Sequence, residues 1–300
     1  MGASDIVPGV SGATIALIFG IYEELIESIR TVGKPHFLRA ALRLRFQEAL
    51  RILNWPFLVS LGTGILIAIL SLSHALEWLL LYHPALLWSF FFGLVLASVV
   101  TVAQRIPRWS PALLAALALG TVGAYWLVGL VPARTPDTYL FLFLSGAIAI
   151  CAMILPGISG AFVLVLLGKY QYVLNAVTSR DLVTLFFVAL GAGIGLITFA
   201  QVIGWLFRKY HDMTVALLTG LMLGSLRKVW PWKKDLAYMV DAQGALVLDS
   251  HGEKIASVQQ NVLPTLMIEG AFNWEIVFAT LLAFVGLGLV ILLHRFAEEI

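Results

Sequence analysis

Two short segments of this 300-residue chain combine proline, glycine and serine within apolar surroundings. The first consists of Pro8, Gly9, Val10, Ser11, Gly12 and Ala13, and the second of Pro156, Gly157, Ile158, Ser159, Gly160 and Ala161. Proline removes a backbone donor and each glycine costs about 1 kcal/mol of helix propensity, so both segments are predicted to interrupt a helix. A helix that restarts there presents free N–H groups and its positive dipole end to the gap, which suits phosphate or carboxylate.

We therefore predict an anion site built from both segments. Hydroxyl groups add donors, and glycines let a ligand approach the backbone closely. The predicted phosphate-binding residues are Gly9, Ser11, Gly12, Ala13, Thr14, Gly157, Ser159, Gly160 and Ala161. The alternative is that each break is only the tip of a packed hairpin. Two breaks at corresponding positions of two halves favour a transport site over that alternative.

Four ionisable residues near the breaks are secondary candidates. Asp5 is predicted either to carry a coupled proton or cation or simply to cap the broken helix. Glu23, near the end of the first apolar segment, is a second candidate for coupling. Arg30 and Lys169 lie near the mouths of the two segments, where they either attract phosphate or anchor the chain at the membrane interface.

The elements that position these residues are predicted to be membrane helices. Sixty per cent of the residues are hydrophobic and 12% are charged, against about 25% charged in soluble domains. Several apolar runs reach about 20 residues, the length that spans a ~30 Å hydrocarbon core. A net charge of +2 gives no reason to expect nucleic-acid binding. The single cysteine, Cys151, excludes an intramolecular disulfide and a thiolate metal cluster, and no cofactor or metal is expected.

Self-similarity divides the chain into two halves, residues 1–135 and 136–300. Three blocks recur in the same order: residues 8–13 with 156–161, 57–65 with 186–194, and 93–98 with 220–225. After the first block, Gly20 and Tyr22 also align with Gly168 and Tyr170. A repeat of this kind predicts two copies of one structural unit.

Each half is predicted to hold one broken, re-entrant helical segment and three transmembrane helices. In the first half these are a segment at 5–25, a basic amphipathic linker at 26–54, and spans at 55–73, 85–104 and 111–131. In the second half they are a segment at 139–177 and spans at 182–207, 213–227 and 275–294. Three crossings per half invert the second half relative to the first, so the predicted fold is an all-α polytopic membrane protein of two inverted repeats. The alternative is a segment that crosses fully, which would leave the halves parallel.

Basic residues orient the predicted spans. The linker 26–54 is rich in arginine and is predicted to be cytoplasmic, whereas the loop 74–84 has no Lys or Arg and is predicted to be external. In the inverted arrangement the loop 228–274 is external as well. Within it, residues 245–249 and 255–258 predict two strands of a β-hairpin.

Glycines within the spans are interpreted as packing positions. They are Gly62, Gly64, Gly191, Gly193 and Gly195. No lysine follows them as it would in a phosphate-binding loop, so close helix packing is the favoured interpretation.

The residues that carry a family resemblance are those of the two broken segments. Asp5 to Thr14, the continuation Gly20 to Glu23, and residues 155–160 resemble the bacterial polyprenyl-phosphate transporter family, formerly a membrane domain of unknown function. The resemblance covers nearly the whole chain, although the family usually has glycine where this chain has Ala13. It implies a flippase that returns undecaprenyl phosphate, the lipid carrier of cell-wall precursors, across the bacterial cytoplasmic (inner) membrane.

The resemblance and the broken helices suggest one mechanism. The phosphate would bind between Ser11-Gly12 and Ser159-Gly160 while the polyprenyl tail stays in the lipid, and access would alternate between the two sides. The implied partners are the polyprenyl phosphate, the membrane and a coupling ion, H⁺ or Na⁺. The sequence leaves the oligomeric state open, with a homodimer among the options.

Two other functions remain as alternatives. A secondary transporter of a small soluble anion would fit the repeat and the breaks equally well. A membrane enzyme acting on lipid phosphates fits less well, because the histidines lie scattered through loops and span ends and no carboxylate cluster offers a metal site. These histidines are His36, His74, His83, His211, His251 and His294.

Overall fold

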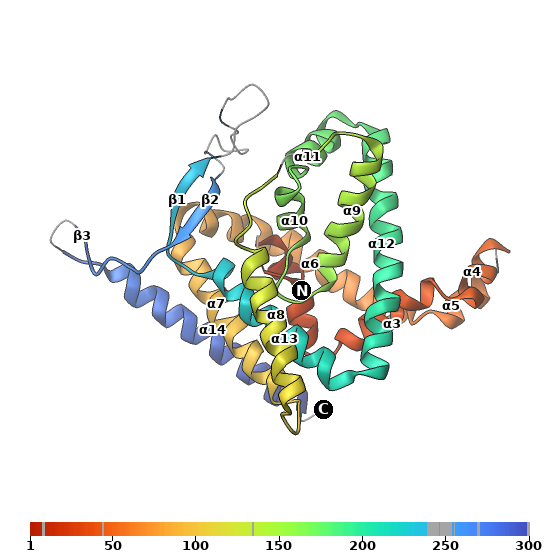
Figure 1. Cartoon of the computed structure of the whole chain (residues 1–300), viewed down its shortest axis with the longest axis horizontal. Helices are drawn as coiled ribbons and strands as arrows, with labels where there is room; N and C mark the ends of the chain where they lie inside the picture. The colour runs from red at the N-terminus through yellow and green to blue at the C-terminus, as the bar shows by residue number, and fades with distance from the viewer. Residues whose placement is uncertain are drawn as a thin grey trace.

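A computed structural model describes residues 1–7, 10–43, 45–133, 135–238, 246, 254, 256–268 and 271–298 (Figure 1). The described chain is predominantly helical. Its first half contains α1 (Gly2–Ile6), α2 (Gly12–Ile18), α3 (Tyr22–Val32), α4 (Pro35–Leu42), α5 (Phe46–Ile52), α6 (Trp55–Tyr82), α7 (Pro84–Ala103) and α8 (Pro111–Leu127). Its second half contains α9 (Tyr139–Ile154), α10 (Gly160–Leu166), α11 (Tyr170–Ser179), α12 (Leu182–Lys209), α13 (His211–Val229) and α14 (Trp274–Glu298).

Four of the described helices are long and apolar enough to cross a membrane: α6, α7, α12 and α14. The helices α10 and α11 together pass the same test but meet at an angle of 106°, which would make a fifth span if they are counted as one. The shorter helices α8 and α9 are also apolar. The protein is therefore an all-α polytopic membrane protein, as the composition predicts.

Helices of the two halves pack against each other in matching pairs. α7 packs on α14, α8 packs on α13, and α7 also contacts α13. Because α7 and α13 carry the aligned blocks at 93–98 and 220–225, the pairs α7–α14 and α8–α13 occupy corresponding places in the two halves. The largest core cluster includes Leu94, Val95, Leu218 and Met222, which lie on these helices.

Glycines allow the closest of these helix contacts. A Cβ added to Gly220 would meet the carbonyl oxygen of Leu117 on α8, and one added to Gly93 would meet that of Ala283 on α14. The backbones therefore approach more closely than any larger residue would permit.

The packing prediction is confirmed for Gly191 and Gly195 of α12, and it is wrong for Gly193 of the same helix and for Gly62 and Gly64 of α6. A Cβ at Gly191 would meet the carbonyl oxygen of Phe143, because α9 packs on α12 there. At Gly62, Gly64 and Gly193 an added Cβ would meet nothing within 4 Å. The space around Gly62 and Gly64 is empty because α6 packs only against the short helix α1 and against α7 among its larger contacts. None of the residues of α6 is buried.

Two predicted connections also differ from the structure. The loop expected at 74–84 is helical as far as Tyr82, because no helix breaker occurs before Pro84. In the loop 228–274, β1 (Lys233–Tyr238) pairs antiparallel with β2 (Ala256–Asn261), and the shorter β3 (Met267–Ile268) pairs with β4 (Ala271–Phe272). The predicted strand at 255–258 corresponds to β2, and its partner is β1. The predicted strand at 245–249 lies outside the described residues, apart from Leu246.

Both short helices that follow the broken segments end in the same way. α2 is followed by Gly20 with φ +72°, and α10 by Gly168 with φ +65°. These backbone conformations are left-handed, which favours glycine and turns the chain into α3 and α11 respectively. Figure 1 shows α11 and the β1–β2 pair at one end of the molecule and the turn from α12 to α13 at the other.

Candidate functional site

The two broken segments contact each other through the hydroxyl group of Ser11. The single proton of this buried hydroxyl is shared between the carbonyl oxygens of Met153 and Leu155, at 3.3 and 3.4 Å, at the end of α9. Met153 lies in the last turn of α9, whose carbonyls have no partner within the helix, and Leu155 is the C-cap, whose carbonyl oxygen also accepts the N–H of Ile158 at 3.5 Å. The hydroxyl from the other half thus adds a donor at this helix end. Ser11 thereby ties the first break to the second.

Two further hydrogen bonds join the segments. The buried hydroxyl oxygen of Thr14 accepts the backbone N–H of Gly157 at 3.0 Å. The hydroxyl of Tyr22 donates to the carbonyl oxygen of Ile154 at 3.1 Å. Side chains of the first half thus satisfy the backbone groups that the second break leaves open, as broken helices at membrane depth require.

The start of α2 is filled by side chains of its own half. Ser11 caps the helix by accepting the N–H of Ala13 at 3.2 Å. The carboxylate of Asp5 accepts the N–H of Gly12 at 2.7 Å. An anion supplied by the protein therefore already lies at this N-terminus, in the manner that the capping alternative for Asp5 predicts. Gly9 lies outside the described residues.

The start of α10 lacks both features. Ser159 occupies the cap position, but its side chain makes no capping hydrogen bond. The residue that aligns with Asp5 is Met153, which cannot accept a hydrogen bond of that strength. Gly160 packs closely on α9, since an added Cβ would lie 2.7 Å from the carbonyl oxygen of Ala149. Ala161 is exposed beyond it.

Glu23 lies at the end of the molecule where α12 turns into α13. Its carboxylate is 3.1 Å from Nε2 of His211, whose Nδ1 is 3.1 Å from Asp212. The carboxylates of Asp212 and Glu23 hold the pKa of His211 above its ordinary value, although partial burial opposes them. Nearby, Arg105 donates to the carbonyl oxygen of Ile18 at 2.9 Å, at the end of α2.

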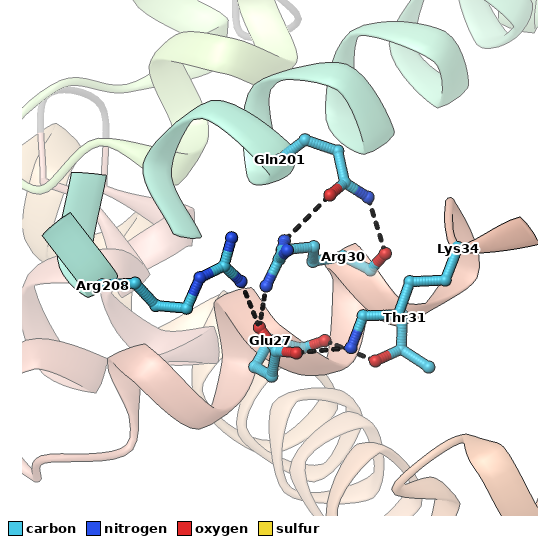
Figure 2. Close-up of polar contacts among 6 residues, drawn as sticks. All are labelled: Glu27, Arg30, Thr31, Lys34, Gln201 and Arg208. Atoms are coloured by element: carbon cyan, nitrogen blue, oxygen red, sulfur yellow. Dashed lines mark hydrogen bonds and ion pairs between the residues drawn. The ribbon is translucent and has the colours of Figure 1, made fainter. Parts of the chain in front are cut away.

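Arg30 belongs to a cluster of charges around Glu27 (Figure 2). Its guanidinium donates to Glu27 at 2.7 Å and to the side-chain oxygen of Gln201 on α12 at 2.8 Å. Lys34 and Arg208 lie 2.6 and 4.0 Å from the same carboxylate. Partial burial would raise the pKa of Glu27, but the hydrogen bonds from Lys34 and Arg30 outweigh it and lower that pKa.

Lys169 is almost fully buried and faces the connection between the halves. Its ammonium group donates to the carbonyl oxygen of Thr135 at 2.7 Å and to the carboxylate of Asp137. The structure thus gives Arg30 and Lys169 local partners. Within the described part of the chain, no side-chain hydrogen bond joins either of them to residues 10–13 or 156–161.

Several contributors were missed by reasoning from sequence. Tyr22 was noted only as a repeated residue, and nothing in its spacing predicts that its hydroxyl reaches the other half. Arg227, Lys228 and Lys233 line one cavity together with Ala161 and Phe162 of α10, which is far from them in the sequence. Among the described residues, no group of three or more His, Cys, Asp or Glu side chains lies close enough to hold a metal ion.

The fold and the site define a class: a polytopic helical membrane protein in which two repeated broken segments meet. Residues 1–247 match the VCA0040-like family, described as undecaprenyl phosphate translocase-like, and the chain belongs to this family. A polyprenyl-phosphate transporter of Vibrio cholerae is 42% identical over 303 residues, which cover 100% of this chain and 94% of the relative. A polyprenyl-phosphate transporter of Staphylococcus aureus is 33% identical over 255 residues, which cover 77% and 83% respectively. No solved structure matches the chain.

Proposed function

We propose that this protein translocates a polyprenyl phosphate, specifically undecaprenyl phosphate, across the bacterial cytoplasmic membrane, and so returns the carrier lipid for cell-envelope synthesis. The observation that carries the proposal is the contact between the two broken segments, in which Ser11, Thr14 and Tyr22 bond to the backbone of residues 153–157. Family membership and the names of the two relatives support the lipid class.

The architecture proposed for this function is a pair of inverted repeats. Each repeat has a re-entrant segment, residues 5–25 in the first half and residues 139–177 in the second. The 106° bend between α10 and α11 supports re-entry, and the left-handed glycines Gly20 and Gly168 support equivalence of the two turns. The matched pairs α7–α14 and α8–α13 support a movement in which one half rocks against the other and so alternates access.

The phosphate is proposed to bind between the starts of α2 and α10. Ser159, Gly160 and Ala161 would donate from the second half, where no side chain caps the helix. Ser11 and Gly12 would donate from the first half, with Ala13, Thr14, Gly9 and Gly157 lining the gap. A compact anion between two positive helix ends would be stabilised without a full countercharge.

Asp5 suggests how an ion could be coupled to transport. Its carboxylate accepts the N–H of Gly12, and a bound phosphate would compete for the same donor. Binding of H⁺ or Na⁺ to Asp5 would weaken that hydrogen bond and would favour the phosphate. Glu23, which pairs with His211, is a second candidate for the ion, and Arg30 and Lys169 would act at longer range as attractors of phosphate.

A binding comparison tests this function. Purified protein in lipid nanodiscs would be titrated with undecaprenyl phosphate, with undecaprenyl alcohol and phosphatidylglycerol as control lipids. We expect phosphate-dependent binding that weakens in Ser11→Ala/Ser159→Ala. The matched control is Ser60→Ala/Ser71→Ala, which removes two exposed hydroxyls that bond only to carbonyls of their own helix.

Equal affinity for all three lipids would contradict the proposed function. Release of inorganic phosphate from the lipid by purified protein would indicate an enzyme instead. Uptake of free phosphate into sealed vesicles, without lipid binding, would indicate a transporter of a soluble anion.

A further inference from the structure

A cavity of about 640 Å³ lies beside the second broken segment. Ala161 and Phe162 of α10 form one wall, Arg227 and Lys228 at the end of α13 form another, and Lys233 of β1 closes it. The volume falls in the range of small-molecule sites, about 300–1,000 Å³. Because Ala161 directly follows Ser159 and Gly160, the cavity lies next to the proposed phosphate site.

Three cationic side chains line this cavity, and the structure holds each in place. The Arg227 guanidinium lies 4.4 Å from the ring of Tyr125 and donates to the carbonyl oxygen of that residue at 2.9 Å. The Lys228 ammonium lies 4.8 Å from the ring of Phe162. The Lys233 ammonium donates to the carbonyl oxygen of Lys228 at 2.6 Å and lies 4.2 Å from the ring of Trp88.

Carboxylates do not neutralise these cations within the part of the chain that the structure describes. No described acid forms an ion pair with any of the three, and none of the residues that line the cavity is acidic. Burial, and then the charge of Lys228, lower the pKa of Lys233 to about 7, and Asp235 opposes this only in part. Partly buried positive charges without counterions are costly, and an anion would relieve that cost.

The remainder of the cavity is suited to a lipid. Apolar or aromatic side chains of Val131, Tyr170 and Leu236 line it and are exposed. The cations lie at or just beyond the end of α13, which packs on the apolar helix α8 and on the span-length helix α7. We infer that this places them near the level of the lipid head groups. A head group bound by the cations could therefore leave its hydrocarbon chain among the exposed apolar residues.

We propose that this cavity binds the phosphate head group of a polyprenyl phosphate through Arg227, Lys228 and Lys233, as an entry site from which the lipid passes to the second broken segment. This inference rests on the proposed function and assigns it a second, distinct phosphate site. Guanidinium and ammonium groups supply the charge-assisted hydrogen bonds that phosphate oxygens accept most strongly. The same chemistry could bind free phosphate, so the test must separate the two sources.

The test compares the full chain in nanodiscs with the variant Lys228→Gln/Lys233→Gln. The matched control is Lys234→Gln, which removes the same charge from an exposed neighbour that does not line the cavity. Undecaprenyl phosphate, undecaprenyl alcohol and inorganic phosphate are titrated separately. We expect undecaprenyl phosphate to bind at least about tenfold more weakly to the double variant and unchanged to the control, because two charged donors are lost.

A second measurement uses the wild-type chain and so does not depend on how well the variant folds. The lysines are labelled with an amine-reactive reagent, and the modified sites are read by mass spectrometry. We expect undecaprenyl phosphate to protect Lys228 and Lys233 but not Lys234, and we expect undecaprenyl alcohol to protect none of the three.

The outcomes separate this inference from the proposed function. If wild type prefers the lipid phosphate to the alcohol but the double variant binds it equally well and the lysines are not protected, the entry site is wrong and the proposed function stands. If inorganic phosphate protects the lysines as well as the lipid does, the cavity is a site for free phosphate and the inference is overturned. If wild type shows no preference for the lipid phosphate, the proposed function itself fails.

Discussion

The two broken segments share a backbone plan and differ in the side chains that surround it. Each has a serine at the cap position of a short helix and a left-handed glycine at its end. At the start of α2, Asp5 and Ser11 already accept the backbone donors. At the start of α10, Ser159 makes no capping hydrogen bond and a cationic cavity lies alongside.

The difference indicates that the repeated residues determine the backbone conformation of both segments, whereas the residues that are not repeated give the two segments different contacts. Thr14 bonds to the other half, whereas its counterpart Phe162 lines the cavity and contacts Lys228. Asp5 carries a charge that its counterpart Met153 lacks. The first segment therefore provides the contacts between the halves and a carboxylate, whereas the second has no side chain that caps its helix.

The largest effect should come from Gly191→Ala compared with Gly62→Ala, which are equivalent positions in the repeat. A Cβ at Gly191 would overlap the backbone of Phe143, so α9 and α12 must separate, at a cost of about 1–3 kcal/mol or more. Gly62 has open space around it, and alanine there should stabilise α6 by up to about 1 kcal/mol. Thermal unfolding in detergent measures both. Equal losses in the two variants would contradict the asymmetric packing.

Thr14→Val should have the next largest effect on stability. It leaves the buried N–H of Gly157 without its acceptor and should cost about 1–3 kcal/mol. Thr63→Val is the matched control, because the Thr63 hydroxyl is exposed and bonds only within α6. Thermal unfolding of the two variants measures the difference. A Thr14 variant as stable as the control would show that this contact between the halves is dispensable.

Asp5→Asn should sharpen the contrast at the helix starts. It removes the charge that competes for the N–H of Gly12, so undecaprenyl phosphate should bind severalfold more tightly, in line with about 1 kcal/mol for a charge at a helix end. Met153→Leu, at the aligned position, should leave affinity unchanged. Titration in nanodiscs measures both variants, and weaker binding to Asp5→Asn would mean that the carboxylate assists the lipid.

The smallest effect concerns pH and the cavity. The pKa of Lys233 is lowered to about 7 by burial and by Lys228, so this ammonium is charged below that pH and becomes neutral above it. A phosphate monoester, with its second pKa near 6, remains a dianion over the same rise in pH. Affinity for undecaprenyl phosphate should therefore fall modestly above about pH 7 in wild type and stay level in Lys233→Arg. Identical profiles would exclude Lys233 as the titrating group.

The sequence predicts the local backbone conformation better than it predicts contacts between distant segments. The membrane class and the positions of the breaks follow from hydropathy and from proline and glycine, because these act locally. The helix starts at Ser11 and Ser159 agree with that expectation. The empty space around Gly62 and the pairing of β1 with β2 depend on which distant segment lies alongside, and a repeated motif carries no information on that.

Only part of the candidate site could be predicted from the sequence. The repeat predicts that the two breaks correspond, and the resemblance predicts the family. The cluster of Arg227, Lys228 and Lys233 does not follow from the sequence, because α10, which lines the same cavity, is far from these residues in the chain.

The most direct test of the central claim is translocation of undecaprenyl phosphate in sealed proteoliposomes, read by an impermeant phosphatase added outside. A protein that moves the lipid brings the inner-leaflet pool to the outer surface, so wild type should expose the whole pool to cleavage. The Ser11→Ala/Ser159→Ala variant should leave the inner-leaflet fraction protected, whereas Ser60→Ala/Ser71→Ala should behave like wild type. An inner pool that stays protected with wild-type protein, or is exposed equally by the Ser11→Ala/Ser159→Ala variant, would contradict the account.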